Sequence, residues 1–358
     1  MNIFRLSLCL SFYFNSLVFA GETAMTEQFS DTGRVKPVFQ DGKYANPFPI
    51  DSSKIPRKIN MFRMLFRPEN KNTRPAQLLP TRRANMEQAF PQEQNGLHIT
   101  WLGHSSLLVQ IDGVRILIDP VFANEVSPVP LLRSIRRYQE NAPVSADELP
   151  FIDAVFISHD HYDHLNAETI IALAPKVGYF LMPSGVGQYL KIWGIDSEKI
   201  REYTWWEEGM VQGLSKQKLR FVCAPARHFS KRSLFESNKT LWASWIFVGH
   251  THRLFYSGDT SYGFHFKQIG HHYGPFDVTL IENGQYNINW PYSHILPEDG
   301  VQAHLDLRGK SMLPVHWGSF TLSTHDWREP IERVTRAAET RNVHLLKPQV
   351  GETLSIFR

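Results

Sequence analysis

The chain has little cysteine: its 358 residues include two, Cys9 and Cys223. Cys9 lies in a segment with the features of a cleavable leader, so a mature chain with Cys223 alone has no internal disulfide. A small disulfide-stapled fold is therefore excluded, and core packing must hold the fold. Cys223 lies in the apolar run LRFVCAPA, which predicts a buried structural thiol rather than a nucleophile.

Long runs of one charge are also missing. The formal net charge is +3 and no Lys/Arg run occurs, so the electrostatic footprint of a dedicated nucleic-acid binder is absent and we expect no nucleic-acid partner. No low-complexity tract and no sharp internal repeat is present. With 42% apolar and 20% charged residues, the composition is that of a globular protein with one large or two ordinary cores.

An apolar run long enough to span a bilayer is lacking at the amino terminus. Residues 1–20 carry Arg5 and then an apolar stretch softened by Ser and Asn, which is too short and too polar for a membrane span. The pattern is typical of a secretory signal peptide cleaved after Ala20, and predicts export to a periplasmic or membrane-associated location. The alternative is a cytoplasmic protein that starts at Met25.

The composition along the chain divides it into three segments: the predicted signal peptide (1–20), an N-terminal arm (21–95) and a main domain (96–358). The arm is rich in Pro, Asn and charge. Within it, the apolar and basic segment 59–66 either docks the arm onto the main domain or lies at a membrane surface.

Hydrophobic patterns predict an α/β domain after residue 96. Strands are expected at 98–101, 106–111, 115–118, 154–157, 178–182, 219–224, 241–248, 253–257, 278–281, 312–315 and 343–346. Helices are expected at 166–174, 185–193, 297–306 and 329–340. Asp112-Gly113 predicts a hairpin turn. The strands come in two batches, each followed by helices, which favours two packed mixed sheets with helices outside.

The segment SHDHYDHLN (158–166) is the strongest functional signal. It follows an apolar β-branched run and brings His159, His161, Asp163 and His164 together in one loop. Three imidazoles and a carboxylate at this spacing are a ligand set for divalent metals such as Zn²⁺.

Three further candidate ligands follow predicted strands in the same way: His228, Asp259 and His316. Seven ligands exceed the roughly four that one zinc takes, so the sequence predicts a binuclear centre. We expect His159, His161 and His228 on one ion and Asp163, His164 and His316 on the other, with Asp259 bridging. The cofactor is predicted to be two Zn²⁺, with iron or manganese as alternatives.

The order HxHxDH, lone His, Gly-Asp-Thr, lone His resembles the metallo-β-lactamase superfamily, which implies an αββα sandwich. Longer segments resemble the family of N-acylphosphatidylethanolamine-hydrolysing phospholipase D and its bacterial relatives: WLGHSS (101–106), IDPVFANEVSP (118–128), ELPFIDAVFISHDHYDHLN (148–166), SGDTSYG (257–263), SHILPEDGVQAHLDLRGKSMLPVHWGSF (293–320) and HDWREP (325–330). The similarity covers the chain from about residue 98 to its end. The resemblance implies a phospholipid substrate and a homodimer.

The expected chemistry is hydrolysis of a lipid phosphodiester by a metal-bridging hydroxide. No side-chain nucleophile is then required, in agreement with the lack of a G-x-S-x-G motif. Asp259 and His294 are the predicted catalytic residues; His294 either orients the phosphate or protonates the leaving group, unless it only flanks the helix that follows. His104 is expected to support a ligand by a hydrogen bond, and Tyr162 to pack in the loop or line the pocket mouth.

The sequence departs from the pattern of the mammalian lipase family at Gly284-Gln285-Tyr286 and at Asn289-Trp290. We therefore expect the same hydrolytic chemistry with altered recognition of the headgroup or acyl chain. The main alternative is a related metal-dependent lactonase or phosphoesterase with a small soluble substrate. Two others are an iron redox enzyme and a non-catalytic binding protein. The presence of all seven expected ligands argues against a non-catalytic binding protein.

Overall fold

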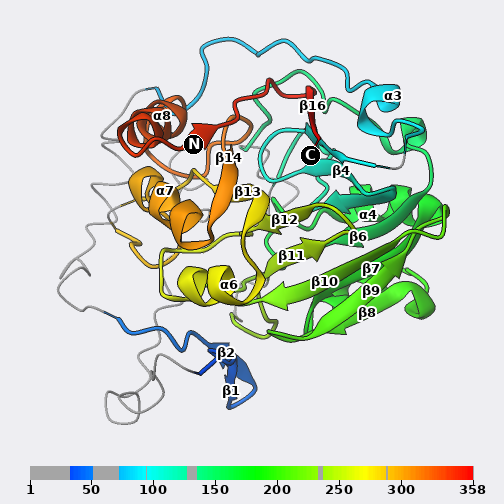
Figure 1. Ribbon diagram of the computed structural model, residues 1–358, viewed down its shortest axis with the longest axis horizontal. Coiled ribbons are helices and arrows are strands. Elements are labelled where there is room, and N and C mark those ends of the chain that lie inside the picture. Colours follow the sequence, from blue (N-terminus) through cyan, green and yellow to red (C-terminus); the bar gives the residue numbers. More distant parts are fainter. Residues whose placement is uncertain are drawn as a thin grey trace, which may run out of the picture.

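The computed structural model describes residues 33–50, 72–93, 95–126, 135–232, 237–287 and 289–357. Two seven-stranded mixed sheets pack against each other, and helices cover the outer faces (Figure 1). This confirms the predicted αββα sandwich. The predicted signal peptide, Cys9 and segment 59–66 lie outside the described residues.

The first sheet has the strand order β16-β3-β4-β5-β6-β7-β8. Its strands are β3 (Leu97–Trp101), β4 (Leu107–Ile111), β5 (Val114–Ile118), β6 (Ile152–Phe156), β7 (Val177–Pro183), β8 (Ile200–Tyr203) and β16 (Thr353–Ile356). Neighbours are antiparallel from β16 to β5 and parallel from β5 to β8. Asp112-Gly113 forms the predicted turn between β4 and β5, with φ of 46° and 86°.

The second sheet has the order β15-β14-β13-β12-β11-β10-β9. Its strands are β9 (Glu208–Gln212), β10 (Lys218–Ala224), β11 (Ser244–Val248), β12 (Arg253–Tyr256), β13 (Phe276–Glu282), β14 (Gly309–Val315) and β15 (His344–Leu345). Neighbours are antiparallel from β9 to β12 and parallel from β12 to β15. A separate hairpin joins β1 (Val38–Gln40) and β2 (Lys43–Ala45).

The helices divide between the two outer faces. They are α3 (Met86–Ala89), α4 (Ala167–Leu173), α5 (Gly187–Ile192), α6 (His265–Tyr273), α7 (Pro297–Asp306) and α8 (Glu329–Thr340), with 3₁₀ turns at Ala146–Glu148, Ala174–Lys176 and Ser197–Lys199. Helices α4 and α5 cover the first sheet, and α6, α7 and α8 cover the second. No helix in the described ranges is both long and apolar enough to cross a membrane.

Aromatic side chains fill the space between the sheets. Phe156 of the first sheet lies 5.1 Å from Phe221, 5.1 Å from Trp245 and 4.8 Å from Phe247 of the second, measured between ring centroids. Cys223 is fully buried in this layer, which confirms the predicted structural thiol, and burial raises the pKa of its thiol. Each sheet is thereby fixed rigidly against the other, so the loops at their edges have a stable base.

The described part of the N-terminal arm packs on the domain. Phe48 is 1% exposed and its ring lies 6.3 Å from that of Trp205 and 5.4 Å from that of Phe264.

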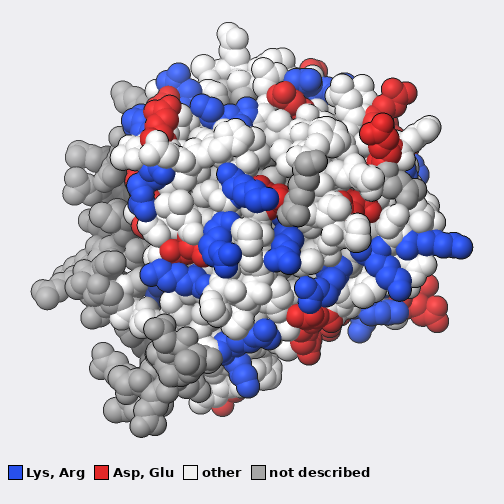
Figure 2. Space-filling model, in the orientation of Figure 1, with Lys and Arg blue, Asp and Glu red and all other residues white. Residues whose placement is uncertain are grey.

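On the face shown in Figure 2, Lys and Arg side chains are interspersed with Asp and Glu and separated by uncharged residues.

Two kinds of element escaped the sequence patterns. Helix α6, whose last turn contains His271 and His272, was not among the predicted helices. A Cβ at Gly270 would lie 2.0 Å from the Asp306 carbonyl oxygen, so glycine is needed where α6 meets the end of α7, although it disfavours a helix. Strands β8, β9 and β16 were not predicted either, because half-exposed edge strands carry a weak apolar signal.

Two buried histidines outside the ligand set predict how stability depends on pH. Burial lowers the pKa of His265 to about 3 and that of His304 to about 4. In the unfolded chain each has a pKa of about 6.5 and takes up a proton as the pH falls below that value. The free energy of unfolding should therefore be intact above pH 6.5 and fall below it, by up to ~1.4 kcal/mol per pH unit for each histidine.

Urea unfolding between pH 6 and pH 4.5 tests this dependence. His304→Asn should reduce the dependence of the free energy of unfolding on pH by the equivalent of close to one bound proton. Equal slopes for the wild type and His304→Asn would show that His304 is protonated in the native state.

Candidate metal centre

The candidate ligands lie where strands of both sheets end. His159, His161, Asp163 and His164 follow β6, and Asn166 then caps α4 by accepting from the backbone N–H of Thr169. The other three candidates follow β10, β12 and β14. Loops at the carboxyl ends of parallel strands are where α/β folds build their sites.

His159, His161, His228 and Asp259 form one group. Their ligand atoms all lie within 4.8 Å of one another. Nδ1 of His161 is 2.8 Å from Nε2 of His159 and 3.2 Å from Nε2 of His228. Three imidazoles that converge in this way offer one cation three of the four positions of a tetrahedral shell.

A second group contains Asp163, His164, His316 and His104, again with ligand atoms within 4.8 Å. Nε2 of His104 donates to Oδ2 of Asp163 at 2.7 Å, so His104 lies behind this carboxylate. The structure thus places His104 in hydrogen-bond contact with a candidate ligand.

Asp259 lies between the two groups. Its Oδ2 is 3.7 Å from Nε2 of His159 and 3.7 Å from Nε2 of His228. Its Oδ1 is 3.2 Å from Nε2 of His164 and 3.2 Å from Nδ1 of His316. Each carboxylate oxygen faces a different histidine group, which is the geometry that a bridging ligand needs.

The histidine rings are held from behind in a consistent way. Nδ1 contacts a protein group in four of them: Ser158 Oγ for His159 (2.9 Å), Asp119 Oδ2 for His164 (2.7 Å), the Ser293 carbonyl for His228 (2.7 Å) and Ser105 Oγ for His316 (3.0 Å). This leaves Nε2 of His159, His164 and His228 to face the centre, whereas in His316 the same Nδ1 also lies 3.2 Å from Oδ1 of Asp259.

Buried polar atoms at the centre also lack partners. Nε2 of His164, Nε2 of His316 and Oδ1 of Asp259 have no hydrogen-bond partner among the described residues. Orphaned buried polar atoms are rare because each costs free energy. Two divalent cations bound by nitrogen and oxygen ligands would satisfy all of them, so the residues present fit a binuclear metal group.

Burial sets the protonation of the imidazoles. It lowers the pKa of His159, His228 and His316 well below the usual range and that of His161 to about 3, which keeps these rings neutral and able to bind metal. His164 is the exception: burial alone would lower its pKa, but the carboxylates of Asp259 and Asp163 outweigh burial and raise it. A cation is therefore already favoured at this point of the site.

Asp119 is a site residue that the sequence patterns missed. It is fully buried and accepts hydrogen bonds from the Ser158 N–H (2.7 Å), Ser158 Oγ (2.5 Å), His164 Nδ1 (2.7 Å) and the Tyr256 hydroxyl (2.6 Å). Asp119 contacts His164 directly and contacts His159 through Ser158. One carboxylate therefore orients a ring in each of the two ligand groups. The available signal was an aspartate just after strand β5.

Backbone conformation brings two of these residues into place. His316 has φ of 65°, a left-handed value that is unusual for histidine, and its N–H donates to the His104 carbonyl at 2.9 Å. Gly258 has φ of 57°, and a Cβ there would lie 2.7 Å from the Ala243 carbonyl oxygen. Glycine is thus required for the turn that presents Asp259.

The structure brings His294 into the same centre, just before Pro297 begins α7. Its ring lies 5.2 Å from that of His228 and stacks 5.4 Å from that of His316. Its Nδ1 contacts Oε1 of Glu282, a fully buried residue that sequence reasoning did not single out. Tyr162 does not reach the centre; its hydroxyl donates to the Arg232 carbonyl at 3.0 Å, and its ring lies 4.2 Å from the Arg232 guanidinium.

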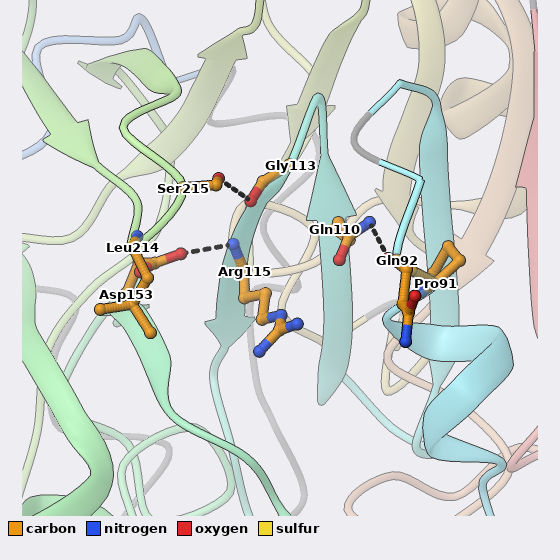
Figure 3. Close-up of a pocket in the computed structure, with 8 residues that line it drawn as sticks. All are labelled: Pro91, Gln92, Gln110, Gly113, Arg115, Asp153, Leu214 and Ser215. Carbon is orange, nitrogen blue, oxygen red and sulfur yellow. Dashed lines mark hydrogen bonds between the residues drawn. The ribbon is translucent and has the colours of Figure 1, made fainter.

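Figure 3 shows the residues that line a separate pocket of about 160 Å³. Its lining includes Gly113 and Arg115 near the start of β5 and Asp153 near the start of β6, whereas the candidate ligands follow the other end of β6. The Asp153 carboxylate accepts from the N–H groups of Arg115 (2.8 Å) and Leu214 (3.1 Å). With no histidine in its lining, this pocket is not the candidate centre.

Comparison with known proteins places the chain in a family. Residues 114–317, more than half of the chain, match the family described as Beta-lactamase superfamily domain. The chain is 41% identical over 323 residues to an uncharacterised protein of Mycobacterium tuberculosis, covering 88% of this chain and 83% of the relative. It is 30% identical over 332 residues to N-acyl-phosphatidylethanolamine-hydrolyzing phospholipase D 1 of Caenorhabditis elegans, covering 87% and 91%.

Among solved structures, the metallo-hydrolase Igni18 of Ignicoccus hospitalis has a similar fold, with a TM-score of 0.54, 22% identity and coverage of 73% of this chain and 99% of that one. At this identity the likeness shows the fold alone. Together with the sequence relatives and the two ligand groups around Asp259, these findings identify the chain as a metal-dependent hydrolase of the metallo-β-lactamase superfamily.

Proposed function

We propose that the chain is a binuclear zinc-dependent phosphodiesterase of phospholipase D type that cleaves N-acylphosphatidylethanolamine-like lipids at a membrane surface. The observation that carries the proposal is Asp259, whose two oxygens face two separate histidine groups. The name of the Caenorhabditis elegans relative supports the choice of bond and lipid.

The ligand sets follow from the two groups. His159, His161 and His228 would hold one ion, and Asp163, His164 and His316 the other, with Asp259 between them. Two bound cations supply a water of lowered pKa and neutralise charge on the phosphate. His104, Asp119, Ser105 and Ser158 hold the ligands in place by the hydrogen bonds described above.

His294 is the proposed partner of the leaving group. Hydrolysis joins a water oxygen to phosphorus and breaks the bond from phosphorus to the headgroup oxygen, which leaves with its electron pair. That oxygen takes a proton from Nε2 of His294, while the attacking water releases one to solvent. A proton donor positioned in this way accelerates such steps by roughly 10²- to 10⁴-fold.

One apolar ring contacts the centre, and one exposed apolar side chain follows His294 closely in the sequence. The ring of Phe229 lies 4.8 Å from that of His161, and Leu296, two positions after His294, is 41% exposed. Among the departures from the mammalian pattern, Gln285 is buried: its Nε2 donates to the Phe320 carbonyl and its Oε1 accepts from the Leu322 N–H. Gln285 therefore braces neighbouring loops rather than contacting a headgroup.

Metal removal tests the proposed function. Chelated protein should lose cleavage of N-acylphosphatidylethanolamine in vesicles, and zinc should restore it, with two metals bound per chain. Binding of ligand at 1,000 times its dissociation constant adds about 4 kcal/mol to the free energy of unfolding, so the melting temperature should rise with zinc as well.

A panel of phospholipids and phosphorylated lactones, assayed with metal analysis of protein purified without added metal, separates the alternatives. A fully metallated enzyme that opens a lactone but leaves every phospholipid intact would overturn the lipid assignment. Iron in place of zinc, with oxygen-dependent turnover, would indicate a redox enzyme.

A further inference from the structure

Glu282, at the carboxyl end of β13, is a fully buried carboxylate next to the candidate metal centre. Its Oε2 accepts from the backbone N–H of Thr260 at 2.5 Å, and its Oε1 contacts Nδ1 of His294. Its own N–H donates to Ser257 Oγ at 2.9 Å. The side chain therefore joins the loop that carries Asp259 to the segment that carries His294.

A buried carboxylate of this kind lowers the stability of the fold, so its presence calls for a functional reason. Transfer of a charged group out of water is unfavourable, and burial together with the nearby Asp259 carboxylate raises the pKa of Glu282. The seven candidate ligands already fill two metal shells without Glu282. Its ligand atom nevertheless lies within 4.8 Å of those of Asp259, His294 and His316.

The contact with Glu282 restricts what His294 can do. Nδ1 of His294 is committed to Glu282 and lies 4.0 Å from Oδ2 of Asp259, so Nε2 is the nitrogen left for a substrate. The ring is 6% exposed and is confined by the rings of His228 and His316. A carboxylate that fixes the tautomer and direction of a histidine in this way is a recurring device in catalysis and metal binding.

We infer that Glu282 is a positioning residue that holds His294 with Nε2 toward the leaving group of the phosphodiester, an inference that rests on the proposed function. When the headgroup oxygen leaves phosphorus with its electron pair, it takes the Nε2 proton of the His294 imidazolium, which is left as a neutral ring with its Nδ1–H still donated to the Glu282 carboxylate. The Glu282 carboxylate faces the opposite nitrogen throughout, and His294 regains its proton from solvent. Without Glu282 the ring can turn and present either nitrogen.

Substrates with different leaving groups distinguish a positioning role of Glu282 from a merely structural one. An alkyl headgroup needs a proton as it leaves, whereas p-nitrophenolate leaves without one. Glu282→Gln keeps an acceptor for Thr260 but turns an amide toward His294. It should lower kcat on N-acylphosphatidylethanolamine by about 10- to 100-fold, with little change in KM, and leave hydrolysis of bis(p-nitrophenyl) phosphate within about threefold of the wild type.

Three further variants complete the experiment on the zinc-loaded full chain. His294→Asn should show the same selective loss, and the double variant should lose no more than either single one. Glu282→Asp, one methylene shorter, keeps the charge but not the reach and should also lose selectively. Asp277→Asn, a buried carboxylate at the other end of β13 that accepts from the Arg253 N–H and from Lys310, is the matched control and should leave both activities unchanged.

Metal content separates positioning from ligation. Glu282→Gln should retain two zinc ions per chain; loss of one would show that Glu282 is a ligand and would overturn the inference. Equal losses on both substrates, or additive losses in the double variant, would also overturn it. A wild type inert on both phosphodiesters would instead contradict the proposed function.

Discussion

Replacing Asp259 by asparagine is expected to lower kcat by about three orders of magnitude, which corresponds to about 4 kcal/mol of lost transition-state stabilisation. The reason is geometric. Oδ1 of Asp259 faces His164 and His316, and Oδ2 faces His159 and His228. An amide keeps one ligand oxygen but cannot bridge two cations, so metal analysis should also give fewer than two ions per chain. Binding of the lipid itself should persist.

Asp160→Asn is the matched control for this variant. Asp160 lies in the loop after β6 that carries His159 and His161 and is 2% exposed, but its carboxylate accepts from the Lys231 N–H, Thr240 Oγ1 and the Tyr189 hydroxyl instead of facing the two ligand groups. The control should keep two metals and most of its kcat. An Asp259→Asn enzyme with a tenth or more of the wild-type activity would show that no bridging carboxylate is needed.

Replacing Asp119 by alanine is expected to have the largest effect on stability. Four hydrogen-bond donors point at this fully buried carboxylate, and the substitution leaves all of them without an acceptor. Loss of a buried network of this size lowers the free energy of unfolding by about 4 kcal/mol or more. Because Asp119 orients His164, and His159 through Ser158, metal affinity should fall as well.

Urea unfolding of the zinc-loaded protein measures the loss in the free energy of unfolding. Competition with a chelator measures the loss in metal affinity. Tyr256→Phe removes one of the four donors and should lower the free energy of unfolding by about 1–2 kcal/mol, with little effect on metal affinity. A loss below about 1 kcal/mol for Asp119→Ala would mean that water replaces the carboxylate and that the network is not a structural requirement.

Much of the fold was predictable because the buried strands are strongly patterned. The predicted helices at 297–306 and 329–340 agree with α7 and α8, since Pro297 and Pro330 each mark a first turn. Edge strands β8 and β9 were missed because exposed and mostly polar positions leave them with few buried apolar residues. Helix α6 was missed because its Gly270 serves a close contact that only the tertiary structure reveals.

The candidate site was also predictable only in part from the sequence. The seven ligand candidates could be found because histidine and aspartate just after a strand are conspicuous, and the structure brings all of them together. Asp119 and Glu282 are single carboxylates at strand ends, and nothing local distinguishes them from turn residues. Their importance comes from partners about 40 and 12 positions away along the chain, a relation that local patterns do not contain.

The path of the water oxygen tests the central claim most directly. The zinc-loaded enzyme should be incubated with N-acylphosphatidylethanolamine vesicles in ¹⁸O-labelled water, and both products analysed by mass spectrometry. Attack at phosphorus predicts one ¹⁸O atom in the phosphatidic acid and none in the N-acylethanolamine. Label in the alcohol or in a released fatty acid, or products that form equally well after complete metal removal, would contradict a two-metal phosphodiesterase of phospholipase D type.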